Sequence, residues 1–205
     1  MLVAVVALTA FSVVADAPAA GADEGLKPGV AAPTFLLPVV NDFKEGKRWG
    51  PAKWTGTPAP ETPKKLVVMS FFATYCEPCK KEMPELARIY DAYKDQGLGV
   101  MLVSIDKGDE QKQVIIDLAK KSGVNFPVMH DRFQVVARRY SAERLPYMLM
   151  LDGTGTVKTV HVGYTDEVKA NLENEVRAGL GLPPLEVAAS PDKKAAVKTT
   201  PKGKG

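Results

Sequence analysis

The sequence predicts an α/β fold with a central mixed sheet flanked by helices, and three observations support this prediction. Two runs, residues 66–72 and 99–105, are apolar and mostly β-favouring, as expected for strands buried on both faces of a sheet. Helical spacing of apolar residues follows each run, so strands and helices alternate. Further on, residues 152–155 read Asp-Gly-Thr-Gly and are typical of a hairpin turn between two antiparallel strands.

Length and composition are those of one globular domain with tails. The chain has 205 residues, of which 45% are hydrophobic and 25% are charged. The formal net charge of +3 is accounted for by the lysines of residues 183–205. No basic stripe interleaved with aromatic residues lies on a predicted element, so we do not expect a nucleic-acid partner.

The N-terminal segment has the features of an export signal. Residues 2–14 form an apolar run that is too short to span a bilayer comfortably, and small residues follow it. Residues 15–17 and 20–22 both fit the A-x-A cleavage pattern, although no Lys or Arg precedes the apolar run. We therefore expect residues 1–22 to be a signal peptide, with an uncleaved membrane anchor as the alternative. No stable membrane span is expected unless this segment is retained.

Composition predicts the organisation of the remaining chain. Residues 23–33 are rich in Gly, Pro and Ala and are interpreted as a linker, and residues 34–182 as the folded domain. Residues 183–205 are rich in Pro, Ala, Lys, Thr and Gly, which predicts a flexible basic tail.

The predicted elements of the domain follow one another with short connections. Residues 34–53 contain short apolar pieces around turn residues, which favours a hairpin. Trp49 and Trp54 are expected to pack on the core rather than form a partner surface, because Trp is highly buried on average. The first long helix begins near Pro78 and ends at Gly97. The later elements are predicted to be a helix from Gly108 or Asp109 to Gly123, a strand at 124–129, a helix at 132–140, strands at 147–151 and 156–162, and a helix at 165–179.

Cys76 and Cys79 lie where the first buried strand passes into a helix N-terminus. The free N-H groups and the positive dipole end of a helix favour an anion, so the thiolate form of Cys76 should be stabilised and Cys76 should be the nucleophile. Cys79, one turn further along, is placed to attack a mixed disulfide on Cys76 and to release the partner in reduced form. Glu77 should partly counter the helix dipole.

Two less reactive interpretations of the cysteine pair are a structural disulfide and half of a zinc site. A structural zinc needs about four ligands, and the only histidines, His130 and His161, stand far along the chain. Both are expected at strand ends or on the surface rather than as ligands. We expect neither a metal nor a cofactor in the main hypothesis, because a C-x-x-C near a β-α pattern is itself a redox signature.

The segment FFATYCEPCKKEMPEL resembles the F-W-A-T-W-C-x-P-C-x-x-E-x-P-x-L block of the thioredoxin superfamily, in particular its extracytoplasmic ResA/TlpA-type proteins. Weaker similarity extends over about residues 32–168. The resemblance implies a thioredoxin-like three-layer sandwich with an N-terminal β-hairpin and an inserted helix. It also implies thiol-disulfide oxidoreductase activity. Tyr75 stands where the family usually has Trp, and we expect it to pack beside the disulfide.

The resemblance assigns a substrate-binding group around the cysteines. Pro146 matches the family's cis-proline that faces the disulfide, and the backbone of Leu145 would then pair with an extended substrate segment. Tyr75 and Pro78 complete this predicted group. The alternative for Pro146 is an ordinary turn proline.

Proton transfer is predicted to involve Glu82. Thioredoxin itself has a buried Asp at the position of Ser70, whereas Glu82 matches a glutamate of ResA-type proteins that stands one helical turn after the second cysteine. A partly desolvated carboxylate there would exchange protons with Cys79. The alternative is an ordinary solvated charge on the helix surface.

The resemblance also implies a physiological setting. Similar proteins reduce disulfides of partner proteins, for example apocytochrome c or proteins with metal-site thiols, and a membrane thiol carrier re-reduces them. The expected location is the periplasm or another extracytoplasmic compartment. A hypothesis from another class is a Cu(I)-binding or metallochaperone module in which Cys76 and Cys79 form a soft dithiolate.

Overall fold

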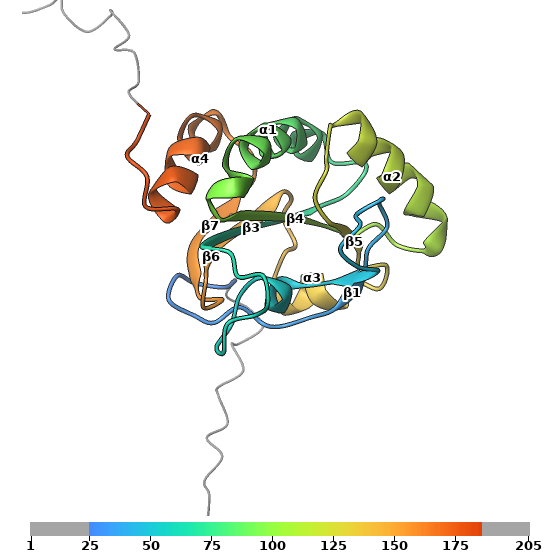
Figure 1. Cartoon of the computed structure of the whole chain (residues 1–205). Helices are drawn as coiled ribbons and strands as arrows, with labels where there is room; N and C mark the ends of the chain where they lie inside the picture. The colour runs from blue at the N-terminus through green and yellow to red at the C-terminus, as the bar shows by residue number, and fades with distance from the viewer. Residues whose placement is uncertain (1–24, 186–205) are drawn as a thin grey trace, which may run out of the picture.

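A five-stranded mixed sheet in the order β5-β4-β3-β6-β7 forms the centre of the protein. In this computed structural model residues 25–185 are described, and Figure 1 shows how their elements are arranged. The strands are β3 (Leu66–Phe72), β4 (Leu98–Ser104), β5 (Val128–His130), β6 (Tyr147–Asp152) and β7 (Val157–Val162). β3, β4 and β5 are mutually parallel, while β6 is antiparallel to both β3 and β7.

Layers on both faces of this sheet complete the predicted three-layer sandwich. In Figure 1, α1 (Glu77–Tyr93), α2 (Lys112–Lys121) and α4 (Asp166–Gly179) lie above the sheet. The lower layer contains α3 (Val135–Arg139) and the two-stranded antiparallel sheet of β1 (Leu37–Pro38) and β2 (Arg48–Trp49). Three short 3-10 helices occupy connections, namely η1 (Pro51–Lys53), η2 (Lys94–Gln96) and η3 (Asp109–Gln111). The order of strands and helices predicted from the sequence is therefore confirmed.

The central strands are buried along their whole length. Every residue of β3 and β4 is buried, which confirms the interpretation of the two apolar runs. Trp49 and Trp54 are also buried and meet edge to face with ring centroids 5.4 Å apart, so the prediction that they pack on the core is confirmed. Trp54 packs directly over Gly99 of β4, where a Cβ would come within 2.7 Å of the indole ring.

The third parallel strand is shorter than predicted. Residues 124–129 were expected to be extended, but β5 contains only Val128–His130. Val124 N still donates to Ala119 O and closes α2, and Pro127 has no N-H to donate to a ladder. The predicted helix at 132–140 is likewise shorter, because Asp131 accepts the backbone N-H groups of Val135 and Ala137 and fixes the start of α3.

The described part of the expected linker runs along the sheet. Leu26 is buried, and Gly29 N donates to Val157 O at 2.8 Å. Val157 N donates to Val30 O at 2.9 Å, so this segment pairs with the edge of β7. The predicted signal segment and residues 186–205 of the predicted tail lie outside the described residues, and the division of the chain into these parts stays a prediction. Within residues 25–185, no helix has the length and apolar character needed to cross a membrane.

Candidate functional site

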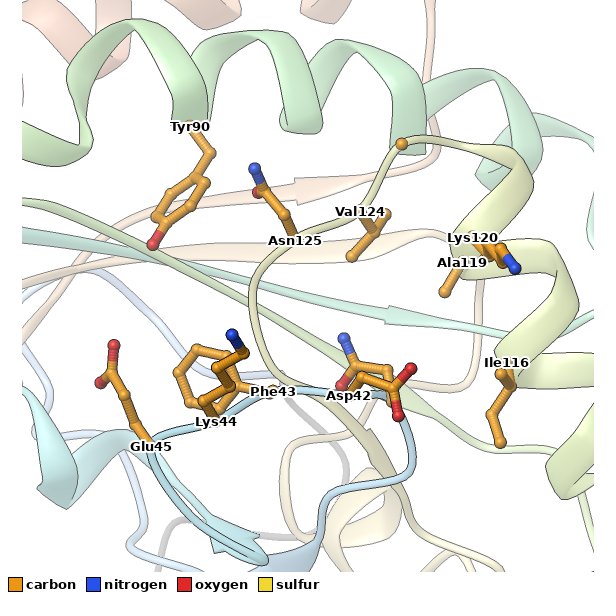
Figure 2. Close-up of a pocket in the computed structure, with 12 residues that line it drawn as sticks. Asp42, Phe43, Lys44, Glu45, Tyr90, Ile116, Ala119, Lys120, Val124 and Asn125 are labelled. Carbon is orange, nitrogen blue, oxygen red and sulfur yellow. The ribbon is translucent and has the colours of Figure 1, made fainter.

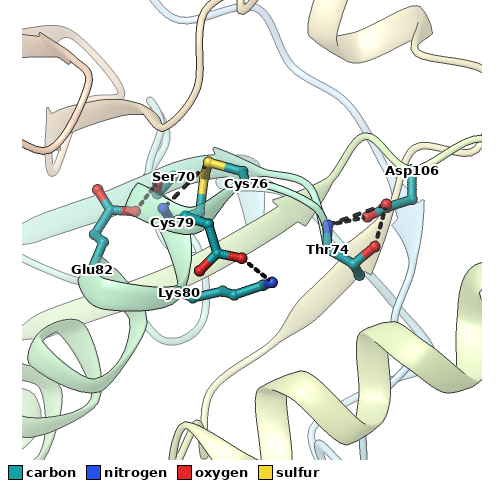
Figure 3. The surroundings of a disulfide bond; sticks show 8 residues. Ser70, Thr74, Cys76, Cys79, Lys80, Glu82 and Asp106 are labelled. Atoms are coloured by element: carbon teal, nitrogen blue, oxygen red, sulfur yellow. Dashed lines mark hydrogen bonds and ion pairs between the residues drawn. A yellow bond between two sulfur atoms is a disulfide. The ribbon is translucent and has the colours of Figure 1, made fainter.

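A disulfide between Cys76 and Cys79 lies at the N-terminus of α1, immediately beyond the end of β3 (Figure 3). The two Sγ atoms are 2.07 Å apart and the Cα atoms 5.3 Å apart. Cys76 is the N-cap of the helix, where its Sγ accepts the backbone N-H of Cys79 at 3.3 Å. This location is the one predicted from the sequence, and it places a sulfur against the free N-H groups of a helix start.

The two sulfurs differ in their access to solvent. Cys76 is 9% exposed, whereas Cys79 is 0% exposed. A partner molecule can therefore reach the Cys76 sulfur, whereas the Cys79 sulfur is closed to it. This asymmetry favours the predicted order of attack.

Exposed side chains surround the mouth of the site. Tyr75 is 71% exposed, so the expectation that this ring packs beside the disulfide is wrong; it points into solvent where a partner can contact it. Pro78 is exposed as well. Glu77 and Lys80 form a solvent-exposed ion pair at 2.6 Å, and the hydrogen bond from Lys80 lowers the pKa of Glu77. Glu77 is therefore an anion beside the helix start, as the sequence suggested.

Glu82, one helical turn after Cys79 in α1, is buried rather than solvated. It is 1% exposed, and its Oε2 accepts a hydrogen bond from Ser70 Oγ at 2.7 Å (Figure 3). Its Oε1 is also buried and has no hydrogen-bond partner among the described residues. Burial raises the pKa of Glu82 to about 7, partly offset by the hydrogen bond from Ser70. Glu82 therefore changes protonation state near neutral pH, one helical turn after Cys79.

Pro146 lies at the same end of the sheet as the disulfide. Phe71 of β3 pairs with Tyr147 of β6, so the residue before Tyr147 stands beside the end of β3 from which the chain continues to Cys76. The peptide bond between Leu145 and Pro146 is cis, as the resemblance implied. Leu145 itself is half-buried at this edge.

A buried carboxylate holds the loop between β3 and α1. Asp106, just beyond the end of β4, accepts the backbone N-H of Thr74 at 3.0 Å and the Thr74 hydroxyl at 2.7 Å (Figure 3). Ser104 Oγ donates at 2.7 Å to Oδ2 of Asp106, the oxygen that also accepts the Thr74 N-H at 3.0 Å. We call this set the Thr74–Asp106 clamp, with Ser104 as its third member. Sequence reasoning missed it, and the only signal was a polar residue at the end of each of two adjacent parallel strands.

The histidines do not lie at the disulfide. His130 is buried at the end of β5, with Nε2 2.8 Å from Asp106 O, and His161 pairs with Glu175 at 2.7 Å. In the described part of the chain, no group of three or more His, Cys, Asp or Glu side chains is arranged to hold a metal ion.

A cavity of about 610 Å³ lies away from the disulfide (Figure 2). Its lining includes Phe43, Tyr90 and Val124, and neither cysteine contributes to it. The disulfide therefore lies outside this cavity.

The fold and the sulfur pair together define a thioredoxin-like thiol-disulfide oxidoreductase. The chain belongs to the AhpC/TSA family, whose family model matches residues 28–160. It is 33% identical over 157 residues to the thiol-disulfide oxidoreductase ResA of Bacillus subtilis, a match that covers 76% of this chain and 79% of the relative. The ResA of Geobacillus kaustophilus is 31% identical over 112 residues, which cover 54% of this chain and 63% of the relative.

A solved structure supports the same class. A crystal structure from Chlorobium tepidum, assigned as a thiol:disulfide interchange protein of the DsbE type, superposes with a TM-score of 0.64 at 26% identity. The match covers 76% of this chain and 99% of that chain. The resemblance seen in the CEPC segment therefore extends over the folded domain.

Proposed function

We propose that the protein is an exported reductant of protein disulfides in which Cys76 attacks, Cys79 resolves and Glu82 handles the proton. The observation that carries this proposal is the unequal burial of the two sulfurs, together with the buried carboxyl group of Glu82 one helical turn after Cys79. The apolar run at residues 2–14 supports export. Pro146, Leu145, Tyr75 and Pro78 form the proposed contact surface for the partner.

The proposed reaction transfers two electrons from the dithiol to the partner. The Cys76 thiolate attacks one sulfur of the partner disulfide, which forms a mixed disulfide and releases the other partner sulfur as a thiolate. Cys79 then gives its proton to Glu82, and its thiolate attacks Cys76 Sγ. The Cys76–Cys79 disulfide forms, the bond to the partner breaks, and the second partner sulfur leaves as a thiolate.

The class of partner follows from the site. An exposed rim around a sulfur that is only slightly exposed fits a flexible segment carrying a reachable disulfide, and we propose partners such as apocytochrome c or proteins with metal-site thiols. A membrane thiol carrier would return the protein to its dithiol state. The Cu(I)-binding alternative has no observation in the described residues that favours it.

Reduction of insulin by the dithiol form tests the activity. The unaltered protein should turn over, Cys76→Ser should abolish turnover, and Cys79→Ser should accumulate a mixed disulfide that can be isolated on non-reducing gels. Turnover that survives Cys76→Ser would contradict the proposal. Stoichiometric Cu(I) retention against competing thiols, without insulin reduction, would favour the metal-binding alternative.

A redox titration against glutathione tests the direction of electron flow. A reductant should have a reduction potential at or below the glutaredoxin range, about −200 to −230 mV. A potential near that of the strong oxidant DsbA, about −120 mV, would overturn the reducing assignment.

A further inference from the structure

A second cavity, of about 380 Å³, lies at the same end of the sheet as the disulfide. It is lined from β1, from the starts of α2 and of the β5–α3 connection, and by His130, the last residue of β5. Phe72 pairs with Ser104 and Ser104 pairs with His130, so these three residues stand in one row across β3, β4 and β5. Neighbouring strands are about 4.8 Å apart, which places His130 about 10 Å from the end of β3. The chain continues from that end of β3 to Cys76.

The imidazole of His130 is buried but has one unused nitrogen. The residue is 4% exposed, and its Nε2 lies 2.8 Å from the carbonyl oxygen of Asp106. A carbonyl oxygen only accepts, so Nε2 is the nitrogen that carries the hydrogen. Nδ1 has no hydrogen-bond partner among the described residues. Buried polar groups are normally paired, and this ring lines the cavity, so Nδ1 is a group that a ligand can bind.

The cavity offers a ligand more positive than negative charge. Both of its carboxylates are engaged, Asp109 by Arg132 and Asp131 by two backbone N-H groups of α3. Arg48 of β2 and Lys112 of α2 also line the cavity. Both are exposed, and neither has a carboxylate partner within residues 25–185. The charges that remain without a counter-ion therefore favour an anion.

Exposed apolar side chains beside the cavity suit a macromolecular ligand. Phe133 lines the cavity and is 66% exposed, and the guanidinium carbon of Arg132 is 4.5 Å from the centre of its ring. Val135, at the start of α3, is exposed as well. Towards β3, the exposed ring of Tyr75 stands next to Cys76. A small free acid would leave these side chains uncovered, whereas a protein segment that extends from Cys76 to the cavity would contact them.

We propose that this cavity binds an acidic side chain of the partner protein while the partner's disulfide lies against Cys76. We call it the acid subsite, formed by Arg48, Lys112 and His130. The carboxylate accepts hydrogen bonds from the two cations and from Nδ1 of His130, which carries a proton in the complex. An extended segment rises about 3.3 Å per residue, so the Asp or Glu stands about three to five residues from the partner's reactive cysteine. This inference rests on the proposed reduction of protein disulfides through Cys76.

Binding of the carboxylate should depend on pH, because a nearby anion favours the protonated imidazole. The Asp106 carbonyl holds the other ring nitrogen, and the Asp106 carboxylate is bound by Thr74. Five further charged side chains line the cavity with His130, namely Arg48 of β2, Asp109 of η3, Lys112 of α2, and Asp131 and Arg132 of the β5–α3 connection. Affinity for the acidic segment should therefore increase as the pH falls through the range in which imidazole titrates.

Paired peptide disulfides test the acid subsite. Each peptide carries one cysteine, joined to a chromogenic aromatic thiol, and a Glu or a Gln about four residues before it in one pair and after it in the other. The full-length dithiol protein attacks the peptide sulfur, and the coloured thiolate that leaves gives the second-order rate constant. In one of the two pairs we expect the Glu peptide to react about fivefold faster than the Gln peptide. This Glu/Gln rate ratio should increase as the pH falls.

Charge-removing variants assign the effect to the cavity. Lys112→Gln and Arg48→Gln should each lower the Glu/Gln ratio, and the double variant should bring it to about one. Lys121→Gln removes an exposed charge at the other end of α2 and should keep the ratio of the unaltered protein. An equal fall in the Lys121 variant, or a ratio of about one in the unaltered protein with all peptides reduced, would overturn the acid subsite and leave the proposed reductase activity standing. Failure to reduce any peptide would overturn both.

Nitrogen NMR of the imidazoles locates the bound carboxylate. The chain has two histidines, and His161, which pairs with Glu175, is an internal control. A Glu peptide with Ser in place of Cys, added to the disulfide form, should shift Nδ1 of His130 to its protonated position and leave His161 unchanged. The Gln peptide should shift neither ring. An unmoved His130 would overturn the proposal, and so would equal affinity for N-acetylglutamate, because the occupant would then be a free acid rather than a partner segment.

Discussion

At the scale of single residues, the least ordinary feature is the buried carboxyl group of Glu82. The sequence left open that Glu82 is a solvated charge on the helix surface. The structure excludes this alternative, because Glu82 is buried and accepts a hydrogen bond from Ser70. A fully buried carboxylate destabilises a folded protein unless it is paired, because burial penalises the charged form. Glu82 stands at a position where an uncharged Gln would cost less to bury, and such perturbed carboxyl groups are typical of functional sites.

The free energy of unfolding of the disulfide form should depend on pH, because burying the ionised Glu82 carboxylate is unfavourable. The pKa of Glu82 is about 7 when folded and 4.5 in the ordinary reference state. The folded protein therefore holds a proton that the unfolded chain loses, and stability falls as pH rises from 4.5 to 7. We expect Glu82→Gln to raise the free energy of unfolding by about 3 kcal/mol above this window and to have little effect below it.

Denaturant unfolding of both proteins across this pH range checks the prediction. Glu110→Gln, which removes an exposed carboxylate, is the control and should track the unaltered protein. A Glu82→Gln protein that is less stable at high pH would mean that the carboxylate is satisfied in a way the structure does not show.

At the scale of secondary-structure elements, the reactive loop depends on β4 as much as on β3. Pairing of Phe72 with Ser104 brings the ends of these two parallel strands side by side. Asp106 then reaches across to Thr74, two residues before Cys76. The clamp fixes the loop from the side opposite Pro146, so Cys76 is held between two strand ends.

A double-mutant cycle on the clamp should reveal this coupling. Asp106→Asn should lower the free energy of unfolding by about 2 kcal/mol, and Thr74→Val by about 1 kcal/mol. The double variant should lose less than the sum, because both changes weaken the contact between the Thr74 hydroxyl and the Asp106 side chain. Chemical denaturation of the disulfide form measures all four corners of the cycle, and strict additivity would show that the clamp carries no coupling energy.

The elements themselves were predictable because their patterns are local. The strand at 66–72, the long helix after it and the later hairpin follow from apolar spacing and turn residues. The short length of β5 could not be predicted in this way. Asn41 bonds Phe126 O and Val128 N, and these residues are far apart in the sequence. The Thr74–Asp106 clamp was missed for the same reason.

At the scale of the whole molecule, the segment before the domain is part of its structure. Leu26 is buried, and Gly29, Val30 and Ala32 share backbone hydrogen bonds with β7 or the turn before it. The sequence of this segment, rich in Gly, Pro and Ala, indicated only a linker because its pairing is carried by the backbone. Its contacts lie at the start of β7, the edge strand of the central sheet.

Chains that begin at residue 25 and at residue 34 should differ in stability. Removal of residues 25–33 exposes apolar surface around Leu26 and breaks the backbone pairing with β7, for an expected loss of about 3 kcal/mol. Leu26→Ala in the longer chain should account for about 2 kcal/mol of it. Thermal unfolding compares the three proteins, and equal midpoints would show that the segment contributes nothing to the fold.

The unequal burial of Cys76 and Cys79 also constrains the order of the catalytic cycle. In the proposed cycle, the electron donor and the oxidised partner would both react through the Cys76 sulfur, because Cys79 is buried. The two would then compete for one contact surface and could not occupy it together. We therefore expect a ping-pong cycle, in which tighter binding of one protein slows the reaction with the other.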